Sequence, residues 1–247
     1  VMDIKFLRNR LCKVIQKLWE QIFPICCVWC KMSGELICRT CMKKIIVHPE
    51  ICPSCHKHSN CGKICSDCKG RYPDLDGIMI AFNYSTLVKK LILSLKYYHI
   101  YGISDFFAQK LSLLCLCNYL LFQNIEYNQI LITAVPSHRY RRYFIKGYNQ
   151  SELLAKACAS QLWVNYQTLV KKSKNTSSQA SLDRKKRLTN LHGSFKLASP
   201  LTNSIKTVIV IDDITTTGST LQEIAQCIKN SYPHVRVRWA VVARSNK

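Results

Sequence analysis

The chain has 247 residues, of which 48% are hydrophobic, and it carries 36 Lys and Arg against 14 Asp and Glu, for a formal net charge of +22. That apolar content supports a packed core and excludes disorder throughout, and the length fits one large domain or a medium domain plus a small one. The positive charge favours a polyanionic partner, either nucleic acid or an anionic membrane surface, although charge alone also fits a merely soluble basic protein.

Residues 1–23 are expected to form an amphipathic helix, because their apolar residues recur at helical spacing. Basic residues interrupt every apolar stretch, which disfavours a secretory signal. The helix either packs on the rest of the protein or lies on the inner-membrane surface, as basic amphipathic helices do. The most apolar run, residues 111–122, is too short to span a bilayer. We therefore expect a cytoplasmic protein with reduced thiols.

Fifteen cysteines are present, and eleven of them fall between Cys12 and Cys68. Eight of these form C-x-x-C pairs: Cys27 and Cys30, Cys38 and Cys41, Cys52 and Cys55, and Cys65 and Cys68. Two residues between cysteines let a tight turn direct both sulfurs at one ion, and two pairs complete a tetrahedral Zn²⁺ site. Four pairs therefore predict two structural Cys₄ zinc sites; a redox role fits a lone C-x-x-C better. Sequential and interleaved pairing both remain open.

The rest of the chain is expected to alternate strands with helices. Strands are predicted at residues 77–84, 130–135, 208–211 and 235–243. Helices are predicted at residues 87–98, 103–122 and 219–229, and from near Asn149. Such alternation indicates an α/β fold with a mostly parallel sheet and helices on both faces. The expected domains are an N-terminal helix (1–23), a cysteine-rich zinc module (24–72) and an α/β domain (73–247).

An acidic, hydroxyl-rich segment follows the strand predicted at residues 208–211. Asp212 and Asp213 stand just past the carboxyl end of that strand, where open α/β sheets bind ligands, and two carboxylates can accept hydrogen bonds from a ribose diol. The next helix begins at hydroxyl residues and Gly218. Its backbone N–H groups and the hydroxyls can donate hydrogen bonds to a phosphate, and glycine lets the backbone approach it closely. Helix capping explains only one or two of these residues. The predicted ligand-binding residues are Asp212, Asp213, Thr216, Thr217, Gly218, Ser219 and Thr220.

Two segments, residues 89–101 and residues 139–148, interleave basic and aromatic residues. That combination binds single-stranded nucleic acid, with cations on the backbone and rings under the bases. The predicted nucleic-acid-binding residues are Lys89, Lys90, Lys96, Tyr97, Arg139, Arg141, Arg142, Lys146, Lys174 and Arg187. A solvated basic face with tyrosines in the core is the alternative. His138 is expected to be a structural part of its loop rather than a general base.

The segment from Val208 to Thr220 resembles the signature of phosphoribosyltransferases, two acidic residues after a hydrophobic strand and then Thr-Thr-Gly-x-Thr. Within that group the chain resembles the ComF family, the DNA-uptake factors of naturally competent bacteria. Residues 91–97 are similar to that family's first helix, and Lys174 to Phe195 to its flexible loop. The residues similar to its pyrophosphate-side loop are Pro136, Ser137, His138 and Arg139, followed by Arg142 and residues 147–150.

The resemblance implies a type I phosphoribosyltransferase-like fold and an N-terminal double zinc ribbon, and it favours sequential pairing of the cysteines. It also implies a role in natural transformation. The implied partners are incoming single-stranded DNA, proteins of the DNA-uptake machinery, and phosphoribosyl pyrophosphate or another ribose 5-phosphate ligand.

Two alternative functions stay open. One is an active phosphoribosyltransferase, which would bind Mg²⁺ with phosphoribosyl pyrophosphate. Thr216 counts against a purine salvage enzyme of the hypoxanthine type, because such enzymes carry Asp at this position as the base. The other is an adaptor whose zinc ribbons dock onto proteins. No catalytic residue is assigned.

Overall fold

The computed structural model describes residues 24–98, 100–120, 126–137, 148–173, 193–216 and 218–245. The helix expected at residues 1–23 lies outside them. The chain divides into two compact units, Val1–Ile45 and Ile46–Lys247. This division falls inside the module expected at residues 24–72, so the third and fourth C-x-x-C pairs share a unit with the α/β sheet.

The described part of the first unit is a hairpin followed by a short helix, α2 (Arg39–Met42). An antiparallel bridge joins Cys26 to Ser33 across the hairpin. Its buried residues are Cys27, Val28, Ile37, Cys38 and Cys41. Three of these five are cysteines, so the unit has little hydrocarbon to bury and depends on its thiols for cohesion.

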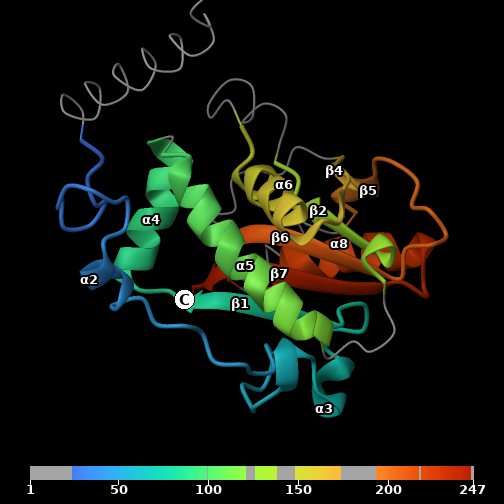
Figure 1. Ribbon diagram of the computed structural model, residues 1–247. Helices are drawn as coiled ribbons and strands as arrows, with labels where there is room; N and C mark the ends of the chain where they lie inside the picture. The colour runs from blue at the N-terminus through green and yellow to red at the C-terminus, as the bar shows by residue number, and fades with distance from the viewer. Residues whose placement is uncertain are drawn as a thin grey trace, which may run out of the picture. The chain divides into compact units, whose positions relative to one another are not determined.

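The second unit is built on a five-stranded sheet with the order β1-β7-β6-β2-β3 (Figure 1). The strands are β1 (Gly77–Asn83), β2 (Ile130–Ala134), β3 (Asn165–Tyr166), β6 (Thr207–Thr215) and β7 (Arg236–Arg244). Every neighbouring pair runs parallel. The central strands are buried along almost their whole length, which explains their nearly continuous apolar sequence.

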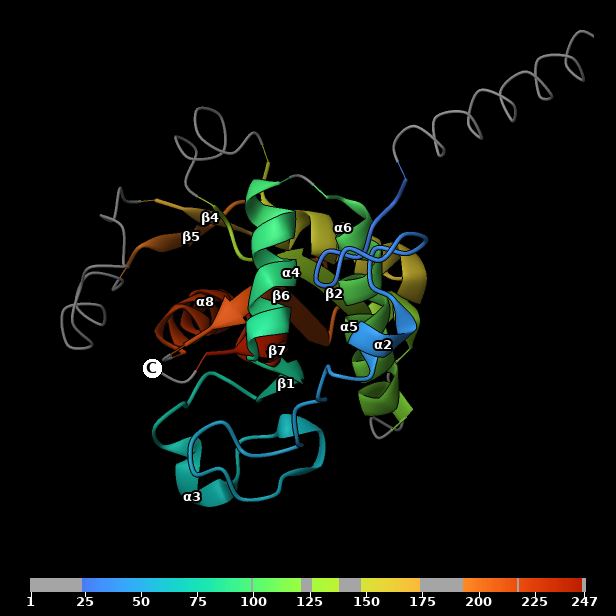
Figure 2. The ribbon, with the colours of Figure 1, turned by 90° about the vertical axis from the view of Figure 1, so that its left-hand side faces the viewer.

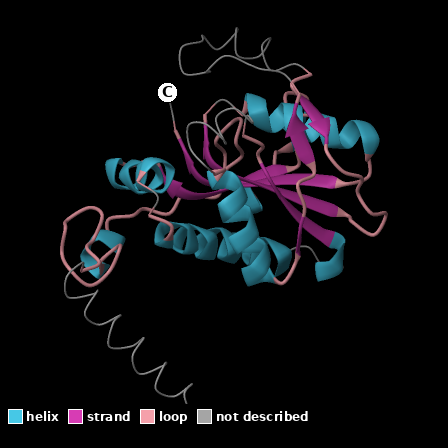
Figure 3. Ribbon diagram, turned by 90° about the horizontal axis from the view of Figure 1, so that it is seen from above, coloured by secondary structure: helices cyan, strands magenta, loops and turns pink. Residues whose placement is uncertain are grey.

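Helices cover both faces of this sheet, as predicted (Figures 2 and 3). They are α4 (Thr86–Tyr97), α5 (Gly102–Leu120), α6 (Gln150–Leu162) and α8 (Ser219–Ser231). Helices α5 and α6 lie on one face, and α8 lies on the other. The core under α8 joins its Ile224 and Ile228 to Val210, Trp239 and Val241 of the sheet. Among the described helices, none is both long and apolar enough to cross a membrane.

The structure adds short elements that the sequence pattern does not predict. Strands β4 (Val170–Lys172) and β5 (Phe195–Leu197) form a separate antiparallel pair. Short helical turns are η1 (Asn60–Gly62), α3 (Ser66–Lys69) and η2 (Tyr127–Gln129). These segments, like β3, are too short to show a hydrophobic period.

Strand β6 is longer than predicted. It continues through Thr215, because β7 pairs with it as far as Thr215 beside Arg244. Asp212 and Asp213 therefore lie within the carboxyl-terminal part of the strand and not past its end. Their backbones are held by the sheet, which positions both carboxylates more rigidly than a loop would.

Candidate metal centres and strand-end site

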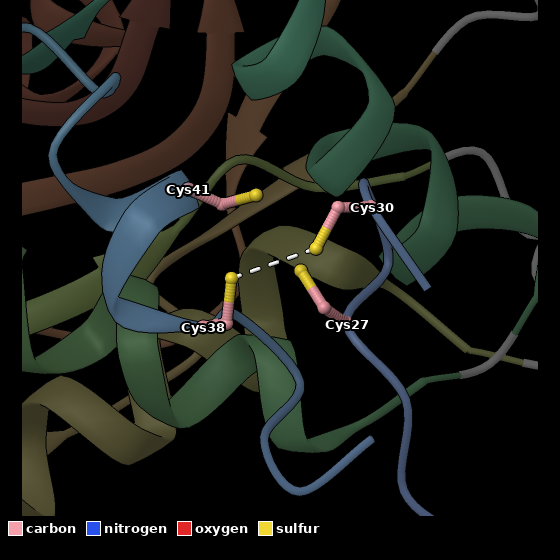
Figure 4. A group of neighbouring side chains, drawn as sticks. All are labelled: Cys27, Cys30, Cys38 and Cys41. Atoms are coloured by element: carbon pink, nitrogen blue, oxygen red, sulfur yellow. Dashed lines mark hydrogen bonds between the residues drawn. The ribbon is translucent and has the colours of Figure 1, made fainter. Parts of the chain in front are cut away.

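The eight predicted metal ligands gather into two clusters. The first cluster is Cys27, Cys30, Cys38 and Cys41, and the second is Cys52, Cys55, Cys65 and Cys68. Within each cluster the sulfur atoms all lie within 4.8 Å of one another. Figure 4 shows the four sulfurs of the first cluster turned toward one another. Pairing is thus sequential, the order that the resemblance favours, and not interleaved.

In each cluster the first C-x-x-C pair lies in a hairpin turn. The backbone N–H of Cys27 donates to the carbonyl of Met32 at 2.8 Å, and the N–H of Cys52 makes the corresponding bond at the same distance. The residue after the pair has a left-handed backbone in both turns, with φ of 68° at Lys31 and 61° at His56.

The second pair of each cluster opens a short helix. Cys38 is the N-cap of α2 and Cys65 the N-cap of α3, with ψ angles of 158° and 160°. The next cysteine of each pair follows within the helix and returns toward the hairpin. The two clusters therefore share one construction, a repeat that the sequence shows only as cysteine spacing.

The backbone around each hairpin favours a thiolate. Burial disfavours the charged form of Cys27, but N–H groups of Cys38, Cys30 and Trp29 outweigh this and lower the pKa of Cys27 to about 6. Cys52 has the matching surroundings. Burial again opposes ionisation, and N–H groups from its own turn and from Cys65 lower the pKa of Cys52 to about 6.

The spacing of the sulfurs fits zinc. The Sγ atoms of Cys30 and Cys38 are 3.5 Å apart, and those of Cys55 and Cys65 are 3.6 Å apart. Tetrahedral Zn²⁺ with Zn–S bonds of about 2.3 Å places its sulfurs roughly 3.8 Å apart. Each cluster can hold one Zn²⁺ ion with four thiolates, and this donor set makes the ion structural.

The acidic pair at the end of β6 is held by two helices. Ser151, in the first turn of α6, donates from its hydroxyl to Asp212 Oδ1 at 2.8 Å, and the backbone N–H of Asp213 donates to the same oxygen at 2.9 Å. Asp213 forms an ion pair with Lys96 of α4 and accepts from the N–H of Ile214 at 2.8 Å. Three elements far apart in the sequence thus meet at one point.

The two aspartates have different electrostatic surroundings. Burial and the neighbouring Asp213 raise the pKa of Asp212 to about 7, against the lowering effects of Ser151 and Lys96. Burial also disfavours the charge of Lys96, but the carboxylate of Asp213 outweighs it and raises the pKa of Lys96. The site therefore holds one compensated carboxylate and one whose ionisation is costly. Hydroxyl donors from a ligand would lower that cost.

The hydroxyl-rich loop lies between β6 and α8. Gly218 is the N-cap of α8 with φ of 77°, a left-handed conformation that glycine adopts without steric cost. Thr216, Ser219 and Thr220 flank it, and Thr217 lies outside the described residues. The helix begins within this string, so the backbone N–H groups of its first turn come from the predicted ligand-binding residues.

The predicted pyrophosphate-side loop starts at the same edge of the sheet. Strands β2 and β6 are neighbours, and the N–H of Val135 donates to the carbonyl of Ile211 at 3.0 Å. Pro136 and Ser137 follow and are half-buried. The Asn149 side chain closes the far end by donating to the carbonyl of Val135 at 3.0 Å. His138 and Arg139 lie outside the described residues.

Four of the predicted nucleic-acid-binding residues are described, all on α4. Lys89 and Tyr97 are exposed, and Lys90 is half-buried. Lys96 pairs with Asp213 and so belongs to the strand-end site. The others, Arg139, Arg141, Arg142, Lys146, Lys174 and Arg187, lie outside the described residues.

Aromatic side chains gather where α4 ends. Tyr97, Tyr98 and Tyr101 are 57%, 73% and 52% exposed, so they are not core residues. The ring of Tyr101 meets Tyr148 edge-on at 5.4 Å between centroids. These rings follow Lys96 directly in the chain.

Ser151 is a site residue that the sequence analysis misses. Its partner Asp212 is 61 positions away, so no local pattern marks the contact. The only signal is its place in the first turn of a helix that follows a strand, where α/β proteins direct side chains at ligands.

Replacing Cys65 by Ser is expected to reduce bound zinc from two ions per chain to one, because the second cluster loses a thiolate ligand. Metal analysis of the purified protein by mass spectrometry measures this. Cys227→Ser, a half-buried thiol of α8 outside both clusters, is the control and should keep both ions. Two tightly held ions in the Cys65 variant would contradict the assignment.

Asp212→Asn is expected to stabilise the protein at pH 7.5. Folding raises the pKa of Asp212. Between pH 7 and about 4 the native state therefore holds a proton that the unfolded state has lost, and the free energy of unfolding rises as pH falls through that window. The variant should be more stable by roughly 1–3 kcal/mol at pH 7.5, an estimate reduced because the side chain keeps some solvent contact. Urea unfolding at pH 7.5 and 4.5 should show the advantage shrinking in acid.

Asp213→Asn is the matched control for this test. It leaves Lys96 half-buried without its carboxylate partner, so we expect a loss of stability at pH 7.5. An Asp212→Asn advantage that is equal at both pH values would contradict the raised pKa.

Comparisons with known proteins agree with this geometry. Residues 149–247 match the family described as phosphoribosyl transferase domain. The matched segment begins at the start of α6 and contains β6, the acidic pair, the hydroxyl-rich loop and β7.

Several relatives align with most of the chain. DNA utilization protein YhgH of Escherichia coli (strain K12) is 29% identical over 217 residues, which cover 83% of this chain and 91% of that protein. Competence protein F of Haemophilus influenzae is 28% identical over 219 residues, covering 84% and 92%. YhgH of Salmonella typhimurium is 28% identical over 217 residues, covering 83% and 91%. The chain is a homologue of competence protein F and of the DNA utilization proteins YhgH, as the ComF resemblance predicts, and it carries a phosphoribosyl transferase domain.

Proposed function

We propose that this protein acts in DNA uptake as a cytoplasmic factor that binds incoming single-stranded DNA. We further propose that its strand-end site binds phosphoribosyl pyrophosphate or another ribose 5-phosphate ligand. The observation that carries the proposal is Lys96, which pairs with Asp213 in the site and directly precedes the exposed Tyr97 and Tyr98 at the end of α4. The names of the relatives, which refer to competence and DNA utilization, support the biological setting.

The ligand is inferred from the chemistry of the site. A ribose diol offers two hydroxyl donors, and Asp212 is the carboxylate whose ionised form is opposed by burial and by the neighbouring Asp213. A phosphate suits the beginning of α8, because a helix N-terminus offers backbone N–H groups and Gly218 stands at that position beside hydroxyl residues. Both halves lie at the end of one strand, so a single ribose 5-phosphate can reach them together.

The nucleic-acid proposal rests on charge and exposed rings. Each Cys₄ site with its Zn²⁺ carries about −2, which leaves the chain near +18 on that estimate. A charge of that size attracts a phosphate backbone. Tyr97, Tyr98 and Tyr101 add exposed faces on which bases of a single strand can stack.

An active phosphoribosyltransferase is the second candidate, and the domain match favours it. Phosphoribosyl pyrophosphate would then bind with Mg²⁺, and the chain would contribute Asp212, Asp213 and the loop at Gly218. Pyrophosphate release in the presence of a nitrogen acceptor would establish this activity; binding without release would leave a ligand site alone.

A protein-docking role for the cysteine module is the third candidate. Ile25, Trp29 and Met32 are exposed on the hairpin of the first cluster, and apolar side chains in that position suit a protein partner. Proteins of the DNA-uptake machinery are the expected partners. This role is compatible with DNA binding elsewhere on the chain.

Single-stranded DNA should bind with an affinity that falls steeply as salt increases, because phosphate contacts release counterions. Filter binding of an unstructured oligonucleotide across a salt series measures this. Replacing Tyr97 and Tyr98 by Ala should weaken binding at least about tenfold at every salt concentration, since stacking contributes roughly 1–3 kcal/mol per base.

The control for this pair is Trp163→Ala, which removes an aromatic ring that is 90% exposed at the end of α6. It should bind DNA as the unaltered protein does. Negligible affinity of the unaltered protein at low salt would refute the DNA-binding proposal.

Phosphoribosyl pyrophosphate with Mg²⁺ should bind the unaltered protein, and a double variant with Asp212→Ala and Asp213→Ala should lose at least about tenfold in affinity. Each hydrogen bond to a charged group contributes about 1.5–3 kcal/mol. Titration calorimetry measures the affinity of the unaltered protein and that of the double variant. Asp105→Ala, an exposed aspartate in the first turn of α5, is the control and should retain the affinity. Equal affinity of the double variant would place the ligand elsewhere.

A further inference from the structure

The second cysteine cluster is connected to the ligand loop through Arg244. The guanidinium of Arg244, at the carboxyl end of β7, donates from Nη1 to the carbonyl of Pro53 at 2.8 Å. Pro53 lies inside the Cys52–Cys55 turn. In the sheet, Arg244 is the register partner of Thr215, the last residue of β6 before the loop, and the N–H of Ser245 donates to Thr215 O at 2.9 Å. One arginine thus bridges the metal-binding turn and the ligand-binding strand.

Tyr72 forms a second connection, at the loop glycine. Tyr72 follows α3, which carries Cys68, and its N–H donates to the carbonyl of Lys69 at 3.1 Å. Its Cε1 and hydroxyl oxygen lie 3.8 and 4.0 Å from the position that a Cβ on Gly218 would occupy. The ring therefore packs beside the residue that opens α8.

Two aspartates fix the segment that follows Tyr72. Asp74 accepts a hydrogen bond from Gln222 Nε2 of α8 at 2.9 Å. Asp76 pairs with Lys69 of α3 at 3.1 Å and with Lys229 of α8 at 2.9 Å. Burial alone would raise the pKa of Asp76, but Lys229, a backbone N–H of β7 and Lys69 hold it below its usual range. Asp76 and its two lysine partners thus connect α3, which carries Cys68 of the cluster, to α8, the helix that begins at the ligand loop.

We propose that Arg244 and Tyr72 are positioning residues for Thr215 at the end of β6 and for Gly218 at the start of α8, and that the second cluster acts on ligand binding through them. The turn around Pro53 contains few apolar residues, so its order depends on the ion that its thiolates hold. The loop needs accurate placement, since Gly218 is left-handed and the N–H groups must converge on one phosphate. A structural metal without an open coordination position thereby sets the affinity of a site that it does not touch. This inference rests on the proposed ligand function of the strand-end site.

Hydrogen exchange of the loop tests the connection without any ligand. In the zinc-loaded full chain, Arg244→Met should raise amide exchange in a peptide covering residues 213–222 by about tenfold, because the strand end loses its link to Pro53. Arg244→Lys keeps a donor and should restore most of the protection. Arg236→Met, the same change at the amino end of β7, is the control and should leave the loop unchanged. Removing zinc with a chelator should reproduce the Arg244→Met result, and reloading should reverse it.

Ligand affinity provides the second measurement. Arg244→Met and Tyr72→Leu should bind phosphoribosyl pyrophosphate with Mg²⁺ about tenfold more weakly, with melting temperatures close to that of the unaltered protein. Unchanged loop exchange and unchanged affinity in both variants would overturn the positioning role while leaving the proposed function intact. If the unaltered protein binds no phosphoribosyl pyrophosphate but Arg244→Met still loosens the loop, the positioning role stands and the proposed ligand is wrong.

Discussion

The parallel pairing of β6 with β7 is the constraint on which the rest of this structure depends. The ladder extends from Thr207 beside Arg236 to Thr215 beside Arg244. It carries β6 past the point where its apolar sequence ends and so places Asp212 and Asp213 on a rigid backbone. Because all strands of the sheet run in the same direction, the loop after β2 and the loop after β6 emerge at one edge. The acidic pair and the starts of both loops therefore lie at the same edge of the sheet.

The two carboxylates at this edge are unequally compensated. Asp213 is compensated by Lys96, whereas Asp212 has a hydroxyl and a backbone N–H but no cation of its own in the described contacts. A buried carboxylate beside another one is costly, and proteins commonly accept such costs where a ligand supplies the missing partners. Burial and the neighbouring Asp213 account for the raised pKa of Asp212.

The two cysteine clusters have the same local construction but different surroundings. The first lies in a unit of whose five described buried residues three are cysteines, so a metal ion held there would be a main source of its order. The second belongs to the α/β unit and is bound to it through Arg244, Asp74 and Asp76. Of the two clusters, the second therefore has direct contacts with the α/β unit.

Local features of this protein were predictable from sequence because each depends on residues close together in the chain. The C-x-x-C spacing predicted the cysteines that gather into two clusters, and the hydrophobic periods predicted the main strands and helices. The string from Asp212 to Thr220 predicted a ligand loop, which stays a prediction. Contacts across the chain were not predictable in this way. The pairing of Lys96 with Asp213, of Ser151 with Asp212 and of Arg244 with the Pro53 carbonyl, and the length of β6, all depend on which segments the sheet brings together. Sequence determined which side chains are available for chemistry, and tertiary structure decided which of them meet, because only the parallel sheet brings their strand and helix ends to one edge.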